Sequence, residues 1–472
     1  MRELAATILL GTCAAGASEW PAFRGGPTNA AWVDLGTLPA PREGWVLRPS
    51  QEARAYANET GVYGSPAVAA VGGRAVMLVG CYDHNVYAVD IATGRELWRY
   101  STGAAVYATP AVAELPSGPV VTVGSTDRTL YALDARDGSK VWARELLQWR
   151  ASVGRASLAS PALFAHRGRT AVLLCAWVHD RSAVQPVEEG MALAYDAMSG
   201  RELWRLPLGR SELAAPGVTR DDDRWRAVVG AADGRVYGLD LGRGQVAWRR
   251  VLRGQIVGSP GIASGRRPLA LLGTRYGIMH AFDLRTGEEV WSFRTAQGID
   301  STPAIAEVEG VLTAFFGSTD QTLYAVAALT GDHLWSFHTP GDVYSSPCVF
   351  RSGGEELVAF TSGDDRLHLL RAATGVEAWS ISPGRYLWGY RVIGDSLWAS
   401  PVAVTLSGRT TLLLPFYDGA IHAYPVAANP PAAEPADPGY GRQMVKRAVL
   451  VMLATLGLCL WLGRKGQVTG DR

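Results

Sequence analysis

The sequence predicts an all-β fold in which eight four-stranded antiparallel sheets close into one ring, and three observations lead to this prediction. First, a hairpin pattern recurs seven times: an apolar run, a turn that carries glycine, and a run that presents tryptophan, as in Tyr87–Trp98. Second, most of these tryptophans stand 43 or 44 residues apart. Third, two further strand-like runs precede each hairpin, so that one period holds four short strands. Such a period is typical of a β-propeller blade.

The seven hairpins share alternating strand residues, a glycine where the turn needs a positive φ, and a large aromatic residue to bury. They are Tyr87–Trp98, Tyr131–Trp142, Ala194–Trp204, Tyr237–Trp248, Ala281–Trp291, Tyr324–Trp335 and Leu369–Trp379. The first run of each unit begins at a proline that usually follows serine or threonine. These prolines are Pro66, Pro110, Pro161, Pro216, Pro260, Pro303, Pro347 and Pro401. We therefore expect eight units.

The eighth unit, Ser400–Tyr424, has three strand-like runs and lacks the hairpin with glycine and tryptophan. The segment Pro41–Ser50 aligns with Thr93–Thr102 and matches Trp45 to Trp98. We predict that this N-terminal strand completes the eighth blade and closes the ring, because closure removes both open sheet edges at once. A ring of seven blades is the alternative.

The N-terminal end of the chain indicates export. Residues 1–18 have the features of a signal peptide, with Arg2 before an apolar run and small residues near Ala15–Ser18. A lipoprotein signal with lipidated Cys13 and an ordinary disordered N terminus are the alternatives. Residues 19–40 are an N-terminal extension, and residues 41–424 form the propeller.

The C-terminal end of the chain indicates membrane attachment. Residues 425–446 form a Pro/Ala-rich stalk, residues 447–464 a transmembrane helix, and residues 465–472 a short tail. Both flanks of the apolar run are basic, so the signal peptide decides the orientation. We expect a propeller on the extracytoplasmic side of the cell envelope, periplasmic or outside, anchored by one C-terminal helix.

Composition excludes several function classes. The 45 basic and 44 acidic side chains leave a net charge of +1, which predicts no nucleic-acid partner. No CxxC pair or metal-ligand spacing occurs among the cysteines. The acidic run Asp221-Asp222-Asp223 lacks the glycine and the spacing of a calcium loop, so we expect a solvated turn there.

The repeat resembles the quinoprotein-type (PQQ-like) β-propeller repeat, whose blade pattern is roughly A-x-D-x-x-T-G-x-x-x-W, and the resemblance covers about Trp45–Tyr424. The segment Trp20–Trp32 also resembles the opening of secreted members of this group. The resemblance implies that each tryptophan docks under the next blade. It also implies one of three roles: a dehydrogenase with bound pyrroloquinoline quinone, an outer-membrane assembly lipoprotein, or another extracytoplasmic domain.

The enzymes of this group carry adjacent cysteines that form a vicinal disulfide against the quinone, an acidic general base and a calcium ion. This chain has no adjacent cysteine pair. Because a fold does not determine function, we predict a non-catalytic binding scaffold with no catalytic residue, metal or cofactor. A periplasmic PQQ-dependent dehydrogenase that uses PQQ and calcium is the alternative.

Three enlarged loops fall on one predicted face: Leu146–Leu158, Trp177–Met191 and Ser382–Trp398. Several positions three residues before the blade prolines are aromatic or acidic, at the predicted channel mouth. The candidate surface for a ligand or partner contains Tyr63, Tyr107, Asp300, Tyr344, Trp398, Trp149, Trp177, Arg385, Trp388 and Arg391. Such rings suit a sugar, a peptide or a planar ligand; alternatively, they pack between inner strands and plug the channel. We expect envelope proteins or an extracytoplasmic ligand as partners.

Overall fold

The computed structural model describes residues 26, 31–36, 38, 44–48, 62, 64–146, 155–180, 187–364, 366–381, 400–415 and 420–426. All of them belong to the first of two compact units, residues 1–431, and the second unit is residues 432–472. The regular elements in these ranges are strands, β1 to β34, and none is a helix suited to crossing a membrane. The predicted signal peptide, stalk, transmembrane helix and tail lie outside the described residues, apart from residues 425–426.

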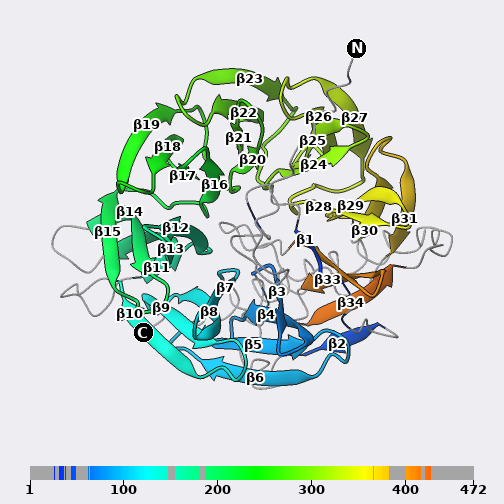
Figure 1. Cartoon of the computed structure of the whole chain (residues 1–472). Coiled ribbons are helices and arrows are strands. Elements are labelled where there is room, and N and C mark those ends of the chain that lie inside the picture. The colour runs from blue at the N-terminus through cyan, green and yellow to red at the C-terminus, as the bar shows by residue number, and fades with distance from the viewer. Residues whose placement is uncertain are drawn as a thin grey trace, which may run out of the picture. The chain divides into compact units, whose positions relative to one another are not determined.

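Figure 1 shows eight sheets that follow one another around a ring, and we number them blades 1 to 8 in that order. Blade 1 contains β3 (Ala67–Val71), β4 (Arg74–Gly80), β5 (Asn85–Asp90) and β6 (Glu96–Ser101). Blade 2 contains β7 (Ala111–Leu115), β8 (Gly118–Ser125), β9 (Thr129–Asp134) and β10 (Lys140–Glu145). Blade 4 contains β16 (Gly217–Asp221), β17 (Arg224–Gly230), β18 (Arg235–Asp240) and β19 (Gln245–Val251).

The next three blades repeat this plan. Blade 5 contains β20 (Gly261–Ala263), β21 (Leu269–Thr274), β22 (Ile278–Asp283) and β23 (Glu289–Arg294). Blade 6 contains β24 (Ala304–Val308), β25 (Val311–Ser318), β26 (Thr322–Ala327) and β27 (His333–His338). Blade 7 contains β28 (Cys348–Ser352), β29 (Glu355–Thr361), β30 (Leu367–Arg371) and β31 (Glu377–Ile381). In each of these six sheets neighbouring strands are antiparallel and follow chain order, and the first strands of successive blades contact one another.

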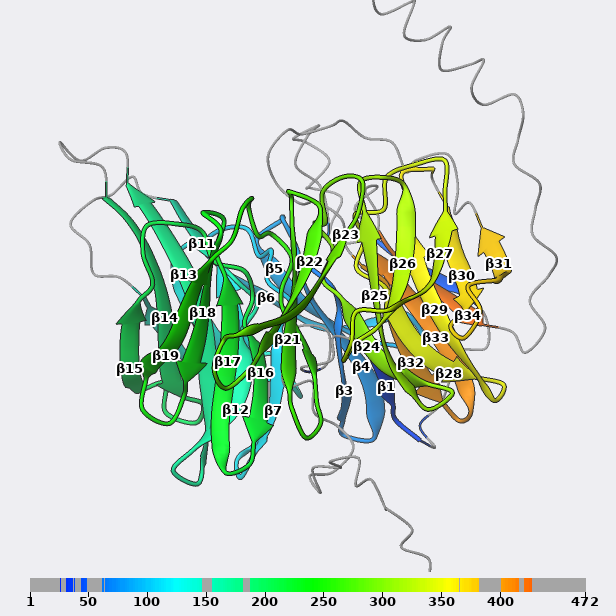
Figure 2. The ribbon, with the colours of Figure 1, turned by 90° about the horizontal axis from the view of Figure 1, so that it is seen from above.

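Blade 3 departs from the plan. It contains β11 (Arg155–Leu158), β12 (Ala162–His166), β13 (Arg169–Asp180), β14 (Val187–Asp196) and β15 (Glu202–Pro207). The ladder of β13 and β14 continues to the pair Asp180–Val187, and β11 pairs with the same part of β13. This three-stranded extension, which we call the blade 3 ribbon, projects from one end of the ring (Figure 2).

The blade 3 ribbon corrects the prediction of enlarged loops at Leu146–Leu158 and Trp177–Met191. β11 forms the last four residues of the first segment, Arg155–Leu158, and β13 and β14 supply residues 177–180 and 187–191 of the second. The physical reason is that a long insert satisfies its backbone N–H and C=O groups most fully by extending the ladder it leaves.

Blade 8 confirms the predicted closure and the count of eight. It contains β32 (Val402–Leu406), β33 (Arg409–Pro415) and β34 (Ile421–Val426), and its outer strand is β2 (Trp45–Leu47) from the N-terminal part of the chain. Trp45 pairs with Ala423 in the antiparallel register. The edge of β34 that would otherwise be open is therefore covered.

The N-terminal extension also supplies a strand that the sequence pattern does not predict. β1 (Trp32–Asp34) pairs in parallel with β32 on the inner edge of blade 8. The Trp32 indole N–H donates to Thr405 Oγ1 at 3.0 Å, and the Cys348 thiol donates to the Ala31 carbonyl oxygen at 3.2 Å. One N-terminal segment therefore holds blade 8 on both edges.

The recurring tryptophans join neighbouring blades, as the resemblance implies. The Trp98 indole N–H donates to the Ala135 carbonyl oxygen of blade 2 at 2.9 Å, and its ring lies against Gly138, where φ is 75°. A Cβ at Gly138 would stand 2.6 Å from Trp98 Cε3, so the turn needs glycine for space as well as for φ. The same indole hydrogen bond links Trp45 to Ile91, Trp142 to Ala197, Trp204 to Leu241, Trp248 to Leu284, Trp291 to Ala328 and Trp335 to Ala372.

The serine or threonine before the blade prolines joins the inner strands. The backbone N–H of one such residue donates at 2.9 Å to the side-chain hydroxyl of its counterpart in the next blade. The pairs are Thr109–Ser160, Ser259–Thr302, Thr302–Ser346 and Ser346–Ser400. Between the blades the core is apolar: Leu271 of blade 5 and Phe316 of blade 6, for example, belong to one fully buried cluster. Polar links near the channel and apolar packing between sheets thus hold the top of each blade at a fixed position.

Candidate binding face

The turns between second and third strands and the connections between blades lie at one end of the ring, which we call the top face. In blade 1 the Asp83 carboxylate accepts hydrogen bonds from the backbone N–H of Asn85 at 3.1 Å and from the Tyr87 hydroxyl at 2.5 Å. In blade 2 Asp127 also accepts from the backbone N–H of Gly103, in the preceding connection, at 2.7 Å. This aspartate therefore fixes its own turn and ties it to the previous blade.

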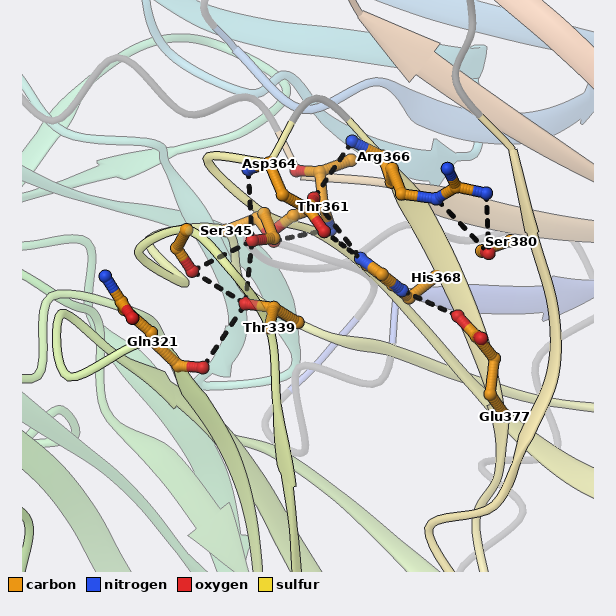
Figure 3. Close-up of polar contacts among 11 residues, drawn as sticks. Gln321, Thr339, Ser345, Thr361, Asp364, Arg366, His368, Glu377 and Ser380 are labelled. Atoms are coloured by element: carbon orange, nitrogen blue, oxygen red, sulfur yellow. Dashed lines mark hydrogen bonds and ion pairs between the residues drawn. The ribbon is translucent and has the colours of Figure 1, made fainter. Parts of the chain in front are cut away.

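In blade 7 a histidine stands where blade 1 has Tyr87. The His368 imidazole is buried between Asp364 and Glu377, with Nε2 3.0 Å from Asp364 Oδ2 and Nδ1 2.8 Å from Glu377 Oε1 (Figure 3). Burial lowers the pKa of His368, but the two carboxylates outweigh burial, so that this pKa lies above its ordinary value. The hydrogen bond with His368 lowers the pKa of Glu377. The arrangement stabilises a buried imidazolium, which is poorly suited to act as a general base.

A hydroxyl network fixes the connection between blades 6 and 7 (Figure 3). The Thr339 hydroxyl donates to the Gly341 carbonyl oxygen at 2.6 Å and lies 2.8 Å from Ser362 Oγ. The Ser345 hydroxyl donates to the Thr361 carbonyl oxygen at 2.8 Å and accepts from the Thr361 N–H at 2.9 Å. Both ends of this connection are therefore hydrogen-bonded to the C-terminal end of β29, at Thr361 and at Ser362, which follows it.

Two of the predicted surface residues, Asp300 and Tyr344, lie on successive connections around the ring. The Arg275 guanidinium donates to the Asp300 carboxylate from Nε and Nη2, both at 3.0 Å. The hydrogen bond to Asp300 is the main cause of the raised pKa of Arg275, and the electrostatic effect of Tyr344 raises this pKa further. The Tyr344 hydroxyl donates to Asp342 at 2.9 Å. The carboxylate of Asp300 is thus neutralised by Arg275, a partner that sequence reasoning missed.

Tyr107 and Trp177 occupy different parts of the top face. Tyr107 is 41% exposed and meets Tyr82 edge to face, with ring centroids 5.6 Å apart. The alternative in which these rings pack between inner strands therefore does not describe Tyr107. Trp177 lies opposite Gly190 on the blade 3 ribbon and is half-buried. The other predicted surface residues lie outside the described part of the chain: Tyr63, Trp398, Trp149, Arg385, Trp388 and Arg391.

The acidic turn of blade 4 differs from the expectation of a solvated turn. Asp221 is 7% exposed and accepts hydrogen bonds from Arg226 Nε at 2.9 Å and from Arg285 Nη2 of blade 5 at 2.6 Å. The hydrogen bond to Arg285, followed by that to Arg226, holds the pKa of Asp221 below its usual value. The side chains of Asp222 and Asp223 are exposed, as expected. The prediction is wrong for Asp221, whose carboxylate links two blades.

The described cysteines include no adjacent pair of the kind that the enzymes of this group carry. Cys81, Cys175 and Cys348 are buried thiols on blades 1, 3 and 7. Burial raises the pKa of Cys81, and it raises that of Cys175 to about 12. In the described ranges no three His, Cys, Asp or Glu side chains are grouped so as to hold a metal ion.

The repeat, the docked tryptophans and the closed ring define an eight-bladed propeller of the PQQ-like type. The family model described as outer membrane protein assembly factor BamB matches residues 42–176, 188–270 and 232–396. The chain belongs to this family.

Relatives of two kinds are similar to the chain. Quinohemoprotein alcohol dehydrogenase ADH IIB of Pseudomonas putida is 29% identical over 140 residues, 26% of this chain and 20% of the enzyme. Outer membrane protein assembly factor BamB of Burkholderia pseudomallei (strain K96243) is 34% identical over 99 residues, 21% of this chain and 24% of that protein. The chain thus matches about a quarter or less of the length of either relative.

A solved structure with the same fold is quinohemoprotein alcohol dehydrogenase from Comamonas testosteroni. It superimposes with a TM-score of 0.60 at 14% identity, over 90% of this chain and 82% of the enzyme. At this identity the likeness concerns the fold alone, which serves assembly factors and dehydrogenases alike.

Proposed function

We propose that this chain is a non-catalytic binding scaffold of the cell envelope, which engages a partner protein through its top face. One observation carries the proposal. The blade 3 ribbon, which breaks the repeat, rises from the same face as the connections that hold Tyr107 and Tyr344, and several titratable groups described on that face are engaged with one another. Rigid recognition elements on a fixed ring are what a binding module needs.

The electrostatics of the top face support binding over acid–base chemistry. His368 is held between two carboxylates, and Asp300 is neutralised by Arg275. Catalytic groups are usually poised to exchange protons near the working pH. Groups that are paired with one another are instead held in place, so that the face has a fixed structure.

The envelope location rests on the family and on the ends of the chain. The family model and one relative are named for outer membrane protein assembly. The predicted signal peptide and the predicted transmembrane helix at 447–464 fit a propeller held outside the cytoplasm by a C-terminal anchor. The partners we propose are therefore envelope proteins, and no quinone or calcium is required.

Site-specific photocrosslinking in the native host tests the top face. A photoreactive phenylalanine analogue is placed at Tyr107, which is 41% exposed, and as a matched control at Val311, which is 42% exposed and lies at the turn between β24 and β25 on the opposite end. We expect a discrete crosslinked envelope protein from position 107 and none from position 311. The same pattern from both positions, or none from position 107, would contradict the proposal.

The alternative function is tested on the purified full chain. It is mixed with PQQ and calcium, and dye reduction is followed with a panel of primary alcohols. The scaffold proposal predicts no turnover above that of the cofactor alone. Saturable turnover that depends on the protein would establish the dehydrogenase instead.

A further inference from the structure

A cluster of cationic side chains lies at the top of blades 4 and 5. Arg253, in the connection between these blades, places its guanidinium carbon 3.9 Å from the ring centroid of Tyr276, and Arg294 at the end of β23 approaches the same ring at 5.4 Å. Both arginines are exposed and Tyr276 is half-buried. We call these three residues the blade 4–5 patch.

The blade 4–5 patch lies where one blade departs from the charge pattern that the other blades share. The turn between second and third strands carries an aspartate in the other described blades of regular length, namely Asp83, Asp127, Asp233, Asp320 and Asp364. In blade 5 this position is Tyr276. The strand register confirms the equivalence: Ala281 pairs with Trp291 as Ala132 pairs with Trp142, and Tyr276 precedes Ala281 by the same number of residues as Asp127 precedes Ala132.

The two arginines of the patch are not neutralised within the described part of the chain. Neither Arg253 nor Arg294 forms an ion pair there, whereas the nearby Arg275 is paired with Asp300 and Arg235 with Asp233. The patch thus retains two positive charges on a face where the other regular blades present carboxylates. Arg294 also replaces a neutral residue, since the matching position of blade 1 is Ser101.

A guanidinium stacked on an aromatic ring has a defined orientation and keeps its N–H donors at the edge of the plane. Two such groups suit carboxylates, because a carboxylate accepts two parallel N–H bonds from one guanidinium. Arginine and tyrosine are also the residues enriched in the energetically important parts of protein interfaces. A ligand with several carboxylates in an extended chain matches this chemistry.

We propose that the blade 4–5 patch binds an acidic segment of a partner protein through the carboxylates of its Asp or Glu residues. This inference rests on the proposed binding function and adds the charge class of the partner. An anionic membrane surface fits less well, because the aspartates of blades 1, 2, 4, 6 and 7 on the same face would oppose a broad negative surface.

Binding of a charge-matched peptide pair tests the proposal on the full chain. One fluorescent peptide alternates Glu and Gly, and its partner alternates Gln and Gly; anisotropy is read at low ionic strength and at roughly 0.15 M. The charge-removing variant is Arg253→Gln/Arg294→Gln. The control variant, Arg243→Gln/Arg266→Gln, removes the same charge from the same two blades at exposed turns of the opposite end.

We expect the wild type to bind the Glu peptide more tightly than the Gln peptide, with an affinity that falls as salt rises. The patch variant should lose about tenfold in affinity for the Glu peptide, as expected for charge-assisted hydrogen bonds. The control variant should lose less than about twofold. Equal binding of the two peptides by the wild type, or equal losses in both variants, would overturn the proposal.

Two further experiments distinguish the ways in which the acidic-segment proposal could fail. Vesicles of phosphatidylglycerol that bind through Arg253 and Arg294, when the Glu peptide does not, would assign the patch to a lipid surface and refute the acidic-segment proposal. A partner crosslinked from position 107 whose capture is unchanged in the Arg253→Gln/Arg294→Gln variant would leave the scaffold function standing and remove the patch from it. Quinone-dependent turnover would instead remove the scaffold function itself.

Discussion

The Trp45 indole N–H donates a 2.8 Å hydrogen bond to the carbonyl oxygen of Ile91, so that one N-terminal tryptophan joins blade 1 to blade 8. Trp45 lies on β2, which pairs with the last strand of blade 8, and its ring packs against Gly94 of blade 1. The junction that closes the ring therefore uses the same contact as the junctions within the continuous chain. Ring closure depends on a segment that lies more than three hundred residues from the strand it completes.

Replacement of Trp45 by alanine should open this junction. We expect Trp45→Ala to lower the free energy of unfolding by about 3 kcal/mol, because a large aromatic group and its hydrogen bond are lost. Val46→Ala is the control, since Val46 is 49% exposed on the same strand, and should cost less than about 0.5 kcal/mol. Urea unfolding followed by circular dichroism measures both, and equal stabilities of the two variants would contradict the closure role.

The glycine of the hairpin turn should be required for space beyond its positive φ. Gly138 has φ 75° and lies against Trp98, whereas Gly408 has φ 71° and a Cβ added there would meet nothing within 4 Å. Both Gly→Ala substitutions carry a backbone cost of about 1 kcal/mol. Only Gly138→Ala must also displace the Trp98 ring, which adds about 1–3 kcal/mol. In thermal unfolding, the melting temperature of Gly138→Ala should be well below that of Gly408→Ala. The same melting temperature for both variants would refute this account.

The buried imidazolium of blade 7 should make stability depend on pH. The pKa of His368 is raised in the folded state, so its contribution is complete below the ordinary value of 6.5 and is lost as pH rises through the folded pKa. The pKa of Glu377 is lowered, so its contribution is complete above 4.5 and is lost as pH falls. Both contributions are therefore complete between about pH 4.5 and 6.5.

The variant His368→Gln removes the titrating group and isolates this effect. The difference in melting temperature between wild type and His368→Gln should be largest near pH 6 and should shrink steadily toward pH 9. The control is His280→Gln in blade 5, where Nδ1 is 2.9 Å from Glu289 and the turn carries Tyr276 instead of an aspartate. A wild-type advantage that stays constant across this range would contradict a raised pKa of His368 in the folded state.

The tryptophan period was sufficient to predict the ring and its closure, because Trp45 repeats a local pattern that each blade needs in order to dock on the next. β1 could not be predicted in this way. Its three residues follow no repeat, and its partner β32 lies near the other end of the sequence. The blade 3 ribbon was missed because polar residues such as Glu188 and Glu189 interrupt the apolar alternation that indicates a strand.

The candidate site was harder to predict, since ionic partners are set by the ring and not by local sequence. Asp300 was selected for its position, but its neutralisation depends on Arg275, and Asp221 depends on Arg285 from the next blade. One signal was present in the sequence: aligned blades show Tyr276 where an aspartate is usual. Departures from a repeat are therefore more informative about function than the repeat itself.

The ion pair between blades 4 and 5 should be structural and independent of calcium. Asp221→Ala leaves Arg226 and Arg285 without their buried acceptor, and we expect it to lower the free energy of unfolding by about 2 kcal/mol. Asp223→Ala removes the same charge from the same turn, where the side chain is exposed, and should cost less than about 0.5 kcal/mol. Thermal unfolding with and without calcium checks both points. A calcium-dependent rise in the wild-type melting temperature that Asp221→Ala abolishes would show that the turn holds a cation, because its carboxylate would then not be committed to arginine.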